Sequence, residues 1–301
     1  MEANPLVSVI ILSFNRKEEL KNTISTIFAQ SYSQVEVIVV DNASTDGTQE
    51  MLLNEHWNVK LIRLQRNIGI NGWEVGWAKA AGEYVIILDD DCSLDNNAVA
   101  KIVETFAMSE TVGAVALNVY NIIENRQTRF PGGWLPSENI EKPIEWFTVL
   151  GCSFAARRTL LTTNIFPKDY FIAFHEPLVS HYIKARNYTI VYANHIRSFH
   201  HIISISHVTA QRRYHHYKNM LNFVFWYAPL PSNFYYSAMM ILLFLYCSVC
   251  QGWTLLCIKA TIKMFKKNGV QNLRRISRLE FELWIKAGLI EYKPLRMLTR
   301  K

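Results

Sequence analysis

The sequence predicts an α/β fold with a mostly parallel central sheet flanked by helices. Two observations lead to this prediction: short β-branched runs alternate with helical stretches through the first half of the chain, and polar residues gather where successive runs end. Strands that alternate with helices need crossover connections, which place neighbouring strands parallel. Ligands bind outside the carboxyl ends of the strands in such sheets, so the polar clusters also predict where a site lies.

Runs rich in valine and isoleucine define the expected strands, because β-branched side chains pack well in a pleated sheet. Strands are expected at residues 7–12, 35–40, 59–64 and 84–88, and helices at residues 17–30, from about residue 46, at 72–81 and from about residue 96. Strand-like pieces follow at residues 112–117, 148–154 and 189–192, between aromatic loops. The sequence contains no internal repeat and no low-complexity linker.

Composition and charge restrict the class of protein. Of the 301 residues, 50% are hydrophobic and 19% are charged, which is typical of a folded chain rather than a disordered one. The net charge of +7 is concentrated between Lys259 and Lys301, directly after a stretch from Asn219 to Ile258 that holds no charged residue. Residues 1–5 do not have the pattern of a secretory signal, and we expect a cytoplasmic protein.

The cysteines are odd in number and scattered, so they predict no disulfide framework and indicate a reducing compartment. They are Cys92, Cys152, Cys247, Cys250 and Cys257. Cys247 and Cys250 form a C-x-x-C pair, but no second pair of ligands lies nearby in the sequence, and we do not assign the pair to zinc or redox chemistry.

Three adjacent aspartates, Asp89, Asp90 and Asp91, follow the expected strand at residues 84–88. Adjacent carboxylates repel one another and destabilise a fold unless a cation lies among them. Their oxygens suit Mg²⁺ or Mn²⁺, which commonly bind one or two carboxylates together with phosphate oxygens of a substrate. Because alternate side chains of an extended segment point the same way, Asp89 and Asp91 can face one ion. The alternative is a solvated acidic loop that caps the following helix.

Asp41 closes the expected strand at residues 35–40 and precedes a polar segment, Asn42–Thr48. One interpretation is an ordinary turn with a helix cap, because Asn, Ser, Asp and Gly favour both. The other is ligand binding, since the Asp41 carboxylate stands at the ligand edge of the sheet, where it could accept a hydrogen bond from a base or a ribose.

Residues 7–16, 39–48 and 88–91 resemble the three signature blocks of family 2 glycosyltransferases, with the same order and spacing. Asn67–Gly69 and Gly72 are similar to the Asn-x-Gly segment of that family. The resemblance is dense up to residue 95 and thinner beyond. It implies a GT-A fold and an inverting transfer from a nucleotide diphosphate sugar, UDP- or dTDP-linked. The implied acceptor is a hydroxyl of a saccharide or lipid-linked saccharide in polysaccharide or cell-envelope biosynthesis.

The resemblance also implies roles for residues at matching positions. Residues of the first block would line the base pocket, Asp41 would contact the base and Asp89 would approach the ribose. Asp91 would bind the Mn²⁺ or Mg²⁺ ion that holds the diphosphate. The residues implied to bind the nucleotide-sugar are Ser13, Asn15, Arg16, Asp41, Asn67, Gly72, Asp89 and Asp90.

An inverting transfer by a single displacement needs a base that takes the proton of the acceptor hydroxyl. The family carries this base in an acidic pair between an aromatic segment and a helix, and residues 170–188 resemble that layout, with Glu176 at the base position. The match is imperfect, because His175 replaces one acidic residue and Leu178 stands where an aspartate is common. The alternative is a glutamate at a helix start, favoured by the helix dipole, with Pro177 in the first turn.

His200 and His201 follow the strand-like residues 189–192. The family often has a histidine in this region that reaches the metal or the diphosphate, and histidine is a reasonable ligand for Mn²⁺. Either of the two could face the ion. The alternative for each is an ordinary surface or core position.

The uncharged stretch at residues 219–258, with lysines directly after it, is typical of an interfacial helix that contacts an anionic membrane. The alternatives are a buried helical hairpin and a membrane span. We expect three parts: a nucleotide-sugar-binding half (1–105), an acceptor-binding and catalytic half (106–218) and a helical, membrane-associating segment (219–301). The resemblance favours peripheral attachment at the inner face of the cell membrane, and we expect no nucleic-acid partner.

Three other functions compete with this interpretation. A dinucleotide enzyme needs a G-x-G-x-x-G turn after the first strand, where this chain has Ser13–Arg16, so we exclude it. A nucleotidyltransferase needs a basic, glycine-rich loop at the same place to hold a triphosphate, and none is present. A catalytically inactive GT-A-like binding protein would be favoured by loss of the base, whereas Glu176 is present.

Overall fold

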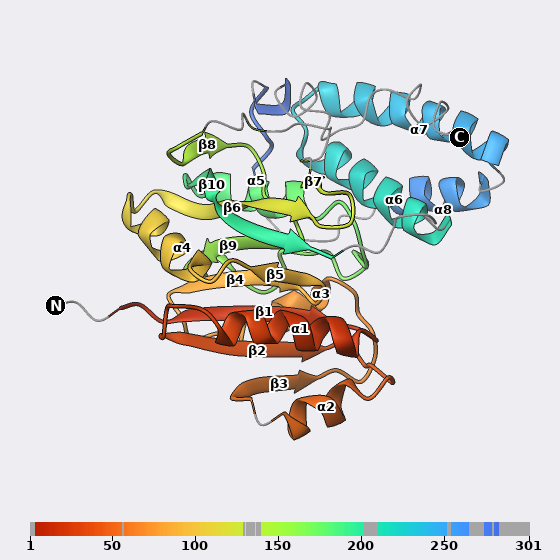
Figure 1. The fold of residues 1–301 in the computed structure, drawn as a ribbon. Coiled ribbons are helices and arrows are strands. Elements are labelled where there is room, and N and C mark those ends of the chain that lie inside the picture. Colours follow the sequence, from red (N-terminus) through yellow and green to blue (C-terminus); the bar gives the residue numbers. More distant parts are fainter. Residues whose placement is uncertain are drawn as a thin grey trace.

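The central sheet is mixed, with helices on both faces (Figure 1). This computed structural model describes residues 4–55, 57–128, 130, 136, 140–201, 210–251, 254–264, 274–278 and 280–282. The strands lie in the order β3 (Val59–Arg63), β2 (Val35–Asp41), β1 (Val7–Ser13), β4 (Tyr84–Asp89), β9 (Ser153–Arg157), β6 (Val112–Asn121), β10 (Thr189–His200) and β5 (Cys92–Leu94). Off this path, β7 (Arg126–Gln127) pairs with β6, and β8 (Ile144–Trp146) pairs with β10. The prediction of an α/β fold is confirmed.

The expected parallel arrangement holds for the half of the sheet that carries the polar strand ends. β3, β2, β1 and β4 are parallel neighbours, and β6 is parallel to β10. β9 lies between β4 and β6 and runs antiparallel to both, so the sheet is mixed beyond β4. The register pairs Ser13 with Asp41 and Leu12 with Asp89. The carboxyl ends of three parallel strands therefore meet at one edge.

Two buried clusters, one on each face of the sheet, hold the helices. The helices are α1 (Lys17–Phe28), α2 (Thr48–Asn54), α3 (Asn71–Trp77), α4 (Ala98–Ala107), α5 (Glu176–Lys184), α6 (Ala210–Tyr227), α7 (Ser232–Gln251) and α8 (Thr254–Met264), with a short 3-10 helix at Arg158–Leu160. Residues of α1, α2 and α4 pack in one cluster, and residues of α3, α5 and α6 pack in the other.

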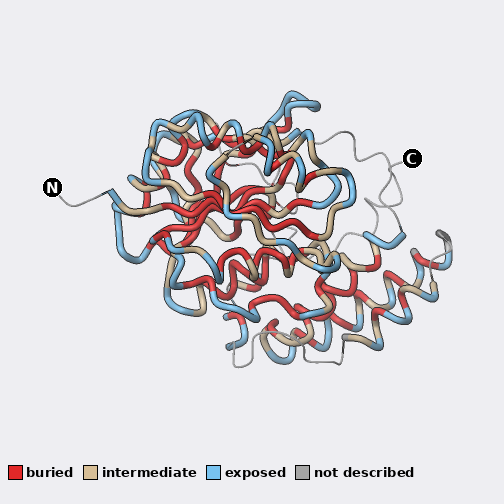
Figure 2. The backbone as a smooth tube through the Cα atoms, turned by 90° about the horizontal axis from the view of Figure 1, so that it is seen from below, coloured by how far each residue is buried: buried red, intermediate tan, exposed pale blue. Residues whose placement is uncertain are grey.

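β1 contributes alternate side chains to the two clusters. Val9 and Ile11 pack in the cluster that contains Ile24 of α1, whereas Ile10 packs in the cluster that contains Trp77 of α3. Figure 2 shows the strands as the buried centre of the molecule. A strand that is buried on both faces needs a nearly continuous hydrophobic run, as residues 7–12 provide. This burial fixes the strand and, with it, the polar residues that follow.

A strand was expected at residues 148–154. In the structure the strand in this region is β9 (Ser153–Arg157), which begins and ends later in the sequence. It reaches Arg157. The Arg157 Nε donates a hydrogen bond to the carbonyl oxygen of Val112 at 2.8 Å, and its guanidinium lies 5.5 Å from the ring centres of Tyr84 and Phe106. Arg157 can therefore end a buried strand, because its charged group finds carbonyl and aromatic partners.

The strand expected at residues 189–192 is much longer than the pattern indicated. β10 pairs with β6 on both sides of an irregularity between Ala193 and Arg197, and it ends at His200. The short strands β5, β7 and β8 carry no periodic signal, because two or three residues are too few to show alternation.

The C-terminal helices differ in burial. α6 packs into the core through residues such as Tyr217, Leu221 and Val224, whereas α7 and α8 expose several large apolar side chains. Within the described residues, every helix falls short of the length or the apolarity that crossing a bilayer requires. The two part boundaries expected from the sequence, 105/106 and 218/219, fall inside α4 and α6.

The contact between Gly69 and Phe171 gives a test of how the two halves of the chain fit together. Gly69 has a φ of +61°, and a Cβ added there would lie 1.9 Å from the carbonyl oxygen of Phe171. Gly47 has a similar conformation, with a φ of +87°, but a Cβ there would meet no atom closer than 3.8 Å. We predict that Gly47→Ala lowers the free energy of unfolding by about 1 kcal/mol, the cost of the left-handed conformation alone.

Gly69→Ala should lower the free energy of unfolding by about 3 kcal/mol, because a backbone clash is added to the same conformational cost. Chemical denaturation of the two variants beside the unchanged chain measures the difference. Equal losses of folding free energy in the two variants would contradict the close approach of the loop that contains Gly69 to Phe171.

Candidate active site

The acidic cluster occupies the turn between β4 and β5. Asp89 ends β4, and Asp90 and Asp91 precede Cys92, where β5 begins. Asp90 and Asp91 are only 5% and 7% exposed, so this is not a solvated acidic loop. The backbone N–H of Phe14 donates to Asp90 Oδ2 at 3.3 Å, and the Thr23 hydroxyl donates to the Asp90 carbonyl. The turn is therefore tied to β1 and α1.

His200 lies directly against this cluster. Antiparallel pairing of β10 with β5 places His200 opposite Cys92, and its Nε2 lies 3.1 Å from Asp91 Oδ1. Burial alone would lower the pKa of His200, but its interactions with Asp91 and Cys152 together outweigh burial and raise the pKa to about 10. Burial would raise the pKa of Asp91, but His200 and Arg16 together lower it. In the structure the two groups form an ion pair.

The donor set fits a divalent cation. Asp89, Asp91 and His200 each offer one ligand atom, and these atoms all lie within 4.8 Å of one another. Burial raises the pKa of Asp89 well above its usual range, and it raises that of Asp90 to about 6 against the opposing charge of Arg16. A cation among these oxygens would offset the cost of holding their charges together. Two carboxylates and an imidazole suit Mn²⁺.

Arg16 lies on the acidic cluster rather than apart from it. Its guanidinium Nη1 is 3.1 Å from Asp90 Oδ1 and 2.6 Å from Asp91 Oδ2, and its side chain is 49% exposed. The resemblance implied a place for Arg16 in a base pocket. In the structure it brings a positive charge to the carboxyl edge of the sheet, against Asp90 and Asp91.

The turns after β1 and β2 are joined by their polar side chains. Asn15 has a φ of 52°, its N–H donates to Ser44 Oγ at 2.9 Å, and its Oδ1 accepts from the N–H of Thr45 at 2.7 Å. Asp41 is fully buried and accepts from the Ser44 N–H at 2.9 Å and from Gln49 Nε2 at 2.6 Å. Both residues therefore shape the turns at the carboxyl edge, beside the buried Ser13.

Asn42 extends this network to the next loop, and the sequence interpretation gave it no role. Its Oδ1 accepts from the N–H of Ile68 at 2.8 Å, and its Nδ2 donates to the Gly69 carbonyl at 3.1 Å. Asn67 acts within the same loop, where its Oδ1 accepts from the N–H of Gly69 at 2.8 Å. A Cβ at Gly72 would lie 2.4 Å from Leu12 Cδ1, so Gly72 lets α3 pack closely on β1.

Glu176 opens α5 at the end of a strained turn. Ala173 and Phe174 have φ values of 65° and 55°, a conformation that costs free energy for residues other than glycine and that often marks a functional site. The Glu176 side chain is 21% exposed, and a Cβ at Gly151 would lie 3.0 Å from its Oε1. Beside Gly151, the Cys152 carbonyl accepts from the N–H of Asp89 at 2.9 Å. The Gly151–Cys152 turn thus lies next to both Glu176 and the acidic cluster.

His175, which stands where an acidic residue was expected, packs as a buried ring. It is 8% exposed, and its ring centre lies 5.0 Å from that of Trp73 in an edge-on arrangement. Burial lowers its pKa. A neutral imidazole, packed against Trp73 of α3, therefore lies directly before Glu176, where the resemblance pattern has a second carboxylate.

α6 holds the turn that precedes Glu176, and no sequence signal indicated this. Asn219 is fully buried, and its Nδ2 donates to the carbonyl oxygens of Ile172 at 3.1 Å and Ala173 at 2.8 Å. The neighbouring Lys218 is 2% exposed and forms an ion pair with Asp169 Oδ2 at 2.9 Å. A buried lysine is costly without a partner, so this pair fixes the start of the same loop.

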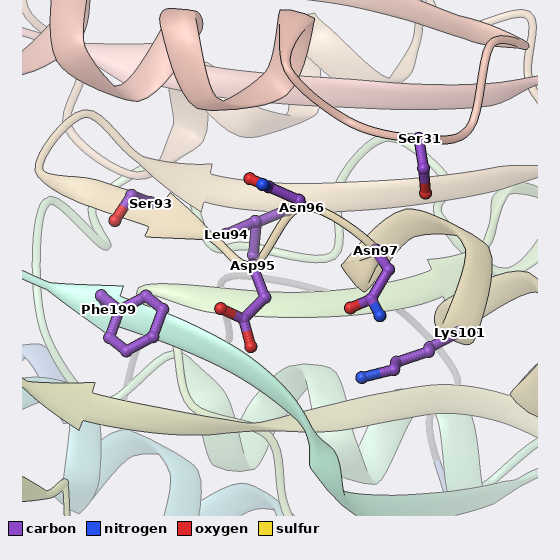
Figure 3. Close-up of a pocket in the computed structure, with 8 residues that line it drawn as sticks. All are labelled: Ser31, Ser93, Leu94, Asp95, Asn96, Asn97, Lys101 and Phe199. Atoms are coloured by element: carbon purple, nitrogen blue, oxygen red, sulfur yellow. The ribbon is translucent and has the colours of Figure 1, made fainter.

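A polar hollow of about 610 Å³ opens beyond β5 (Figure 3). It is lined by Ser31, Ser93, Leu94, Asp95, Asn96, Asn97, Lys101 and Phe199. None of the residues predicted for the site belongs to it. Ser93 Oγ lies 3.0 Å from His201 Nε2, so His201 turns toward this side of β5 while His200 faces the carboxylates.

Comparison with known proteins gives a family match and several partial relatives. The model of glycosyl transferase family 2 matches residues 8–163. An uncharacterized glycosyltransferase of Nostoc sp. strain PCC 7120 is 34% identical over 113 residues, which are 36% of this chain and 35% of that protein. The poly-beta-1,6-N-acetyl-D-glucosamine synthase of Staphylococcus epidermidis is 29% identical over 115 residues, 37% of this chain and 28% of the synthase. The match therefore spans about a third of these relatives.

Solved structures share the fold over most of the chain. GalNAc-T7, in a crystal structure with UDP, GalNAc and Mn²⁺, has a TM-score of 0.63 at 18% identity, covering 76% of this chain and 49% of that one. The mannosyltransferase PcManGT from Pyrobaculum calidifontis, with GDP-Man and Mn²⁺, has a TM-score of 0.57 at 20% identity, covering 99% and 84%. At these identities the likeness shows the GT-A fold alone.

Proposed function

The chain belongs to glycosyl transferase family 2, and from this premise we propose that it is an inverting, metal-dependent enzyme that uses a UDP- or dTDP-linked sugar. The acceptor is a hydroxyl of a saccharide or lipid-linked saccharide, in the synthesis of a polysaccharide or the cell envelope. The observation that supports this proposal is that one turn, Gly151–Cys152, lies next to both Glu176 and the cluster of Asp89, Asp91 and His200.

The donor side of the proposed reaction lies at the carboxyl edge of β1, β2 and β4. Asp91 and His200, with Asp89 beside them, would hold Mn²⁺ or Mg²⁺. When bound, the ion neutralises the diphosphate and so stabilises it as a leaving group. Arg16 adds a positive charge at the same edge, because its half-exposed guanidinium already contacts Asp90 and Asp91. The joined turns that contain Asn15 and Asp41 provide the polar surface for the base and the ribose.

The acceptor side depends on Glu176. Its carboxylate takes the proton of the acceptor hydroxyl as that oxygen attacks the sugar carbon on the face opposite the diphosphate, so the configuration at this carbon is inverted in one step. The partial exposure of Glu176 leaves it accessible to a substrate, while the Gly151 turn and the strained 173–174 backbone limit its orientations. Positioning of this kind lowers the entropic part of the barrier.

Donor binding and turnover can be separated by two variants. UDP or dTDP should raise the melting temperature when Mn²⁺ is present, because a ligand that binds only the folded state stabilises it by about 2.7 kcal/mol at about one hundred times its Kd. Asp91→Asn should abolish this shift, since it removes a ligand of the ion. Glu176→Gln should keep the shift and lose about three orders of magnitude in turnover.

A thermal-shift series with nucleotide diphosphates, followed by release of nucleotide from candidate sugar donors, measures both effects. A metal-independent shift, or full turnover by Glu176→Gln, would contradict the assignment. Binding of nucleotide without turnover of any donor in the unchanged chain would favour the inactive binding protein instead.

The hydrogen bonds from α6 to the turn before Glu176 allow an independent test of how that turn positions the proposed base. We predict that Asn219→Ala lowers kcat about tenfold and leaves the nucleotide-dependent thermal shift unchanged, because the 172–174 turn loses its two amide hydrogen bonds while the acidic cluster stays intact. Asn233→Ala is the matched control. Asn233 is also a buried asparagine that donates to a backbone carbonyl, that of Phe225 at 3.0 Å, but it lies on α7.

Both variants should lose about 1 to 2 kcal/mol of folding free energy, and only Asn219→Ala should change kcat. Equal kcat values in the two variants would show that α6 has no special effect on the turn.

We also propose that α7 and α8 contact an anionic membrane, where a lipid-linked acceptor would be presented. Among the described residues of these helices, the large apolar side chains that are exposed are Phe234, Tyr235, Leu242, Tyr246, Val249, Leu255, Ile258 and Ile262. Leu255, Ile258 and Ile262 recur at helical spacing, and Lys259 lies exposed among them. The two helices contain no acidic residue. Apolar side chains beside lysines match the surface of an anionic bilayer.

Sedimentation with vesicles tests this attachment. The full chain should bind vesicles rich in phosphatidylglycerol more tightly than neutral phosphatidylcholine vesicles. The double variant Leu255→Ser/Ile262→Ser should weaken binding at least about tenfold, from lost apolar burial. Leu53→Ser, which changes a 71% exposed leucine on α2, is the matched control and should bind normally. Unchanged binding by the double variant would place the contact elsewhere.

A further inference from the structure

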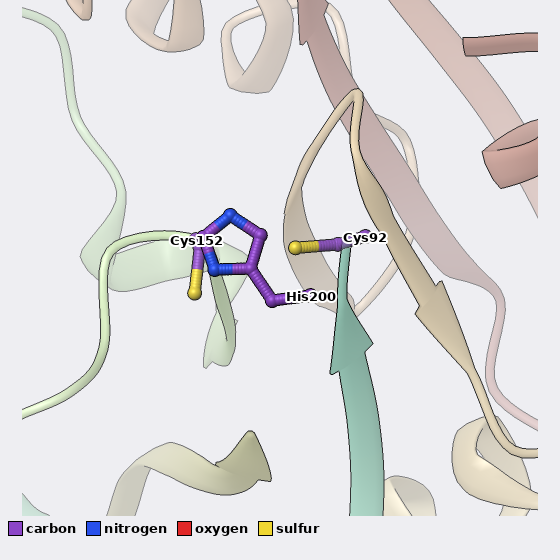
Figure 4. A group of neighbouring side chains, drawn as sticks. All are labelled: Cys92, Cys152 and His200. Atoms are coloured by element: carbon purple, nitrogen blue, oxygen red, sulfur yellow. The ribbon is translucent and has the colours of Figure 1, made fainter. Parts of the chain in front are cut away.

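Two cysteines that the sequence pattern left without a role meet beside His200. Cys92 begins β5, Cys152 lies in the turn before β9, and His200 ends β10. The pairing of β10 with β5 places His200 opposite Cys92, and one ligand atom from each of the three residues lies within 4.8 Å of the others. Figure 4 shows the two thiols and the imidazole converging from these three elements. We propose that Cys92, Cys152 and His200 form a binding site for a thiol-preferring divalent ion such as Zn²⁺.

Asp91 borders this group on the side of Cys92 and His200. Asp91 Oδ1 lies 4.0 Å from Cys92 Sγ and 3.1 Å from His200 Nε2. Bonds of about 2.0 to 2.3 Å in a tetrahedral zinc site place its ligand atoms roughly 3.3 to 3.8 Å apart. The ligand atoms of Cys92, Cys152 and His200 lie within 4.8 Å of one another, so these three side chains need to move together only slightly to hold an ion. Two sulfurs, one nitrogen and one oxygen are a normal ligand set for zinc.

The interior position of the site does not isolate it from solvent. Cys92 is fully buried, but Cys152 is partly exposed and the His200 side chain is 11% exposed. An ion can therefore enter from the side of Cys152 and His200, which is the side of the acidic cluster. A buried cysteine alone would be an ordinary small apolar residue. Here the second thiol and the imidazole distinguish the group from core packing.

The two donor sets share residues and differ in chemistry. Asp89, Asp91 and His200 offer mainly oxygen and suit Mn²⁺ or Mg²⁺, whereas Cys92, Cys152 and His200 offer sulfur and suit Zn²⁺. Both sets depend on the single His200 side chain, which cannot be oriented ideally toward both ions at once. Zinc at the cysteine site therefore withdraws His200 from the donor site and inhibits sugar transfer. This second part rests on the proposed function, but binding of the ion does not.

Cobalt titration of the full-length, chemically reduced chain tests the binding without any substrate. Co²⁺ substitutes for Zn²⁺ and gives near-ultraviolet sulfur-to-cobalt charge-transfer bands only where thiolates bind it. We expect one equivalent of Co²⁺ to give these bands, Zn²⁺ to abolish them, and either Cys92→Ser or Cys152→Ser to reduce them by half or more. Cys257→Ser, a buried cysteine of α8, is the control and should leave them unchanged. Asp89→Asn, which alters only the oxygen-rich set, should also keep them.

Alkylation of the unchanged chain gives a second measurement that needs no variant. Zn²⁺ should slow iodoacetamide labelling of Cys152 at least about tenfold, as quantified by mass spectrometry of its peptide. Absence of charge-transfer bands, bands that persist in both Cys92→Ser and Cys152→Ser, or labelling of Cys152 that Zn²⁺ does not slow would each overturn the site.

The inhibitory effect has its own readout. With Mn²⁺ and a donor present, Zn²⁺ should reduce nucleotide release by the unchanged chain about tenfold more effectively than by Cys92→Ser. Equal inhibition of both proteins would overturn the competition for His200. A chain that transfers no sugar would refute the proposed function, while the cobalt and alkylation results would still decide whether the ion binds.

Discussion

The burial of carboxylates at the end of β4 constrains much of this structure. Asp90 and Asp91 are almost fully buried next to Asp89, and charges held this closely repel one another unless positive groups lie among them. Two such groups come from distant parts of the chain, Arg16 from the turn after β1 and His200 from the end of β10. The fold therefore has to bring together the carboxyl ends of β1, β4 and β10.

The mixed second half of the sheet satisfies this requirement. β9 runs antiparallel between β4 and β6, and β10 follows β6 far enough to pair with β5. That last pairing places His200 opposite Cys92, the residue directly after Asp91. The same register brings Cys152 close, because its carbonyl accepts the backbone N–H of Asp89. The oxygen-rich and the sulfur-containing donor sets are thus consequences of one arrangement of strands.

Local sequence patterns predict the first half of this arrangement well and the second half poorly. Ser13, Asp41 and Asp89 each follow an apolar run, and a parallel register is enough to bring them together. No local pattern of this kind tells whether His200 or His201 faces the acidic cluster. β10 contains an irregularity between Ala193 and Arg197, which changes the parity of the side chains after it. Counting alternate positions from the start of the strand therefore cannot tell which histidine faces the carboxylates.

α6 shows a second kind of contact that a sequence pattern does not reveal. Asn219 donates to backbone carbonyls 46 and 47 residues earlier in the chain, and any loop of suitable shape offers such carbonyls whatever its side chains are. Yet this contact fixes the turn that leads to Glu176, while α7 and α8 pack against the same helix and carry the exposed apolar side chains. If a membrane binds those two helices, its surface is connected through a single buried helix to the loop of the proposed base. An acceptor anchored in that membrane would then approach the enzyme from the side on which Glu176 is held.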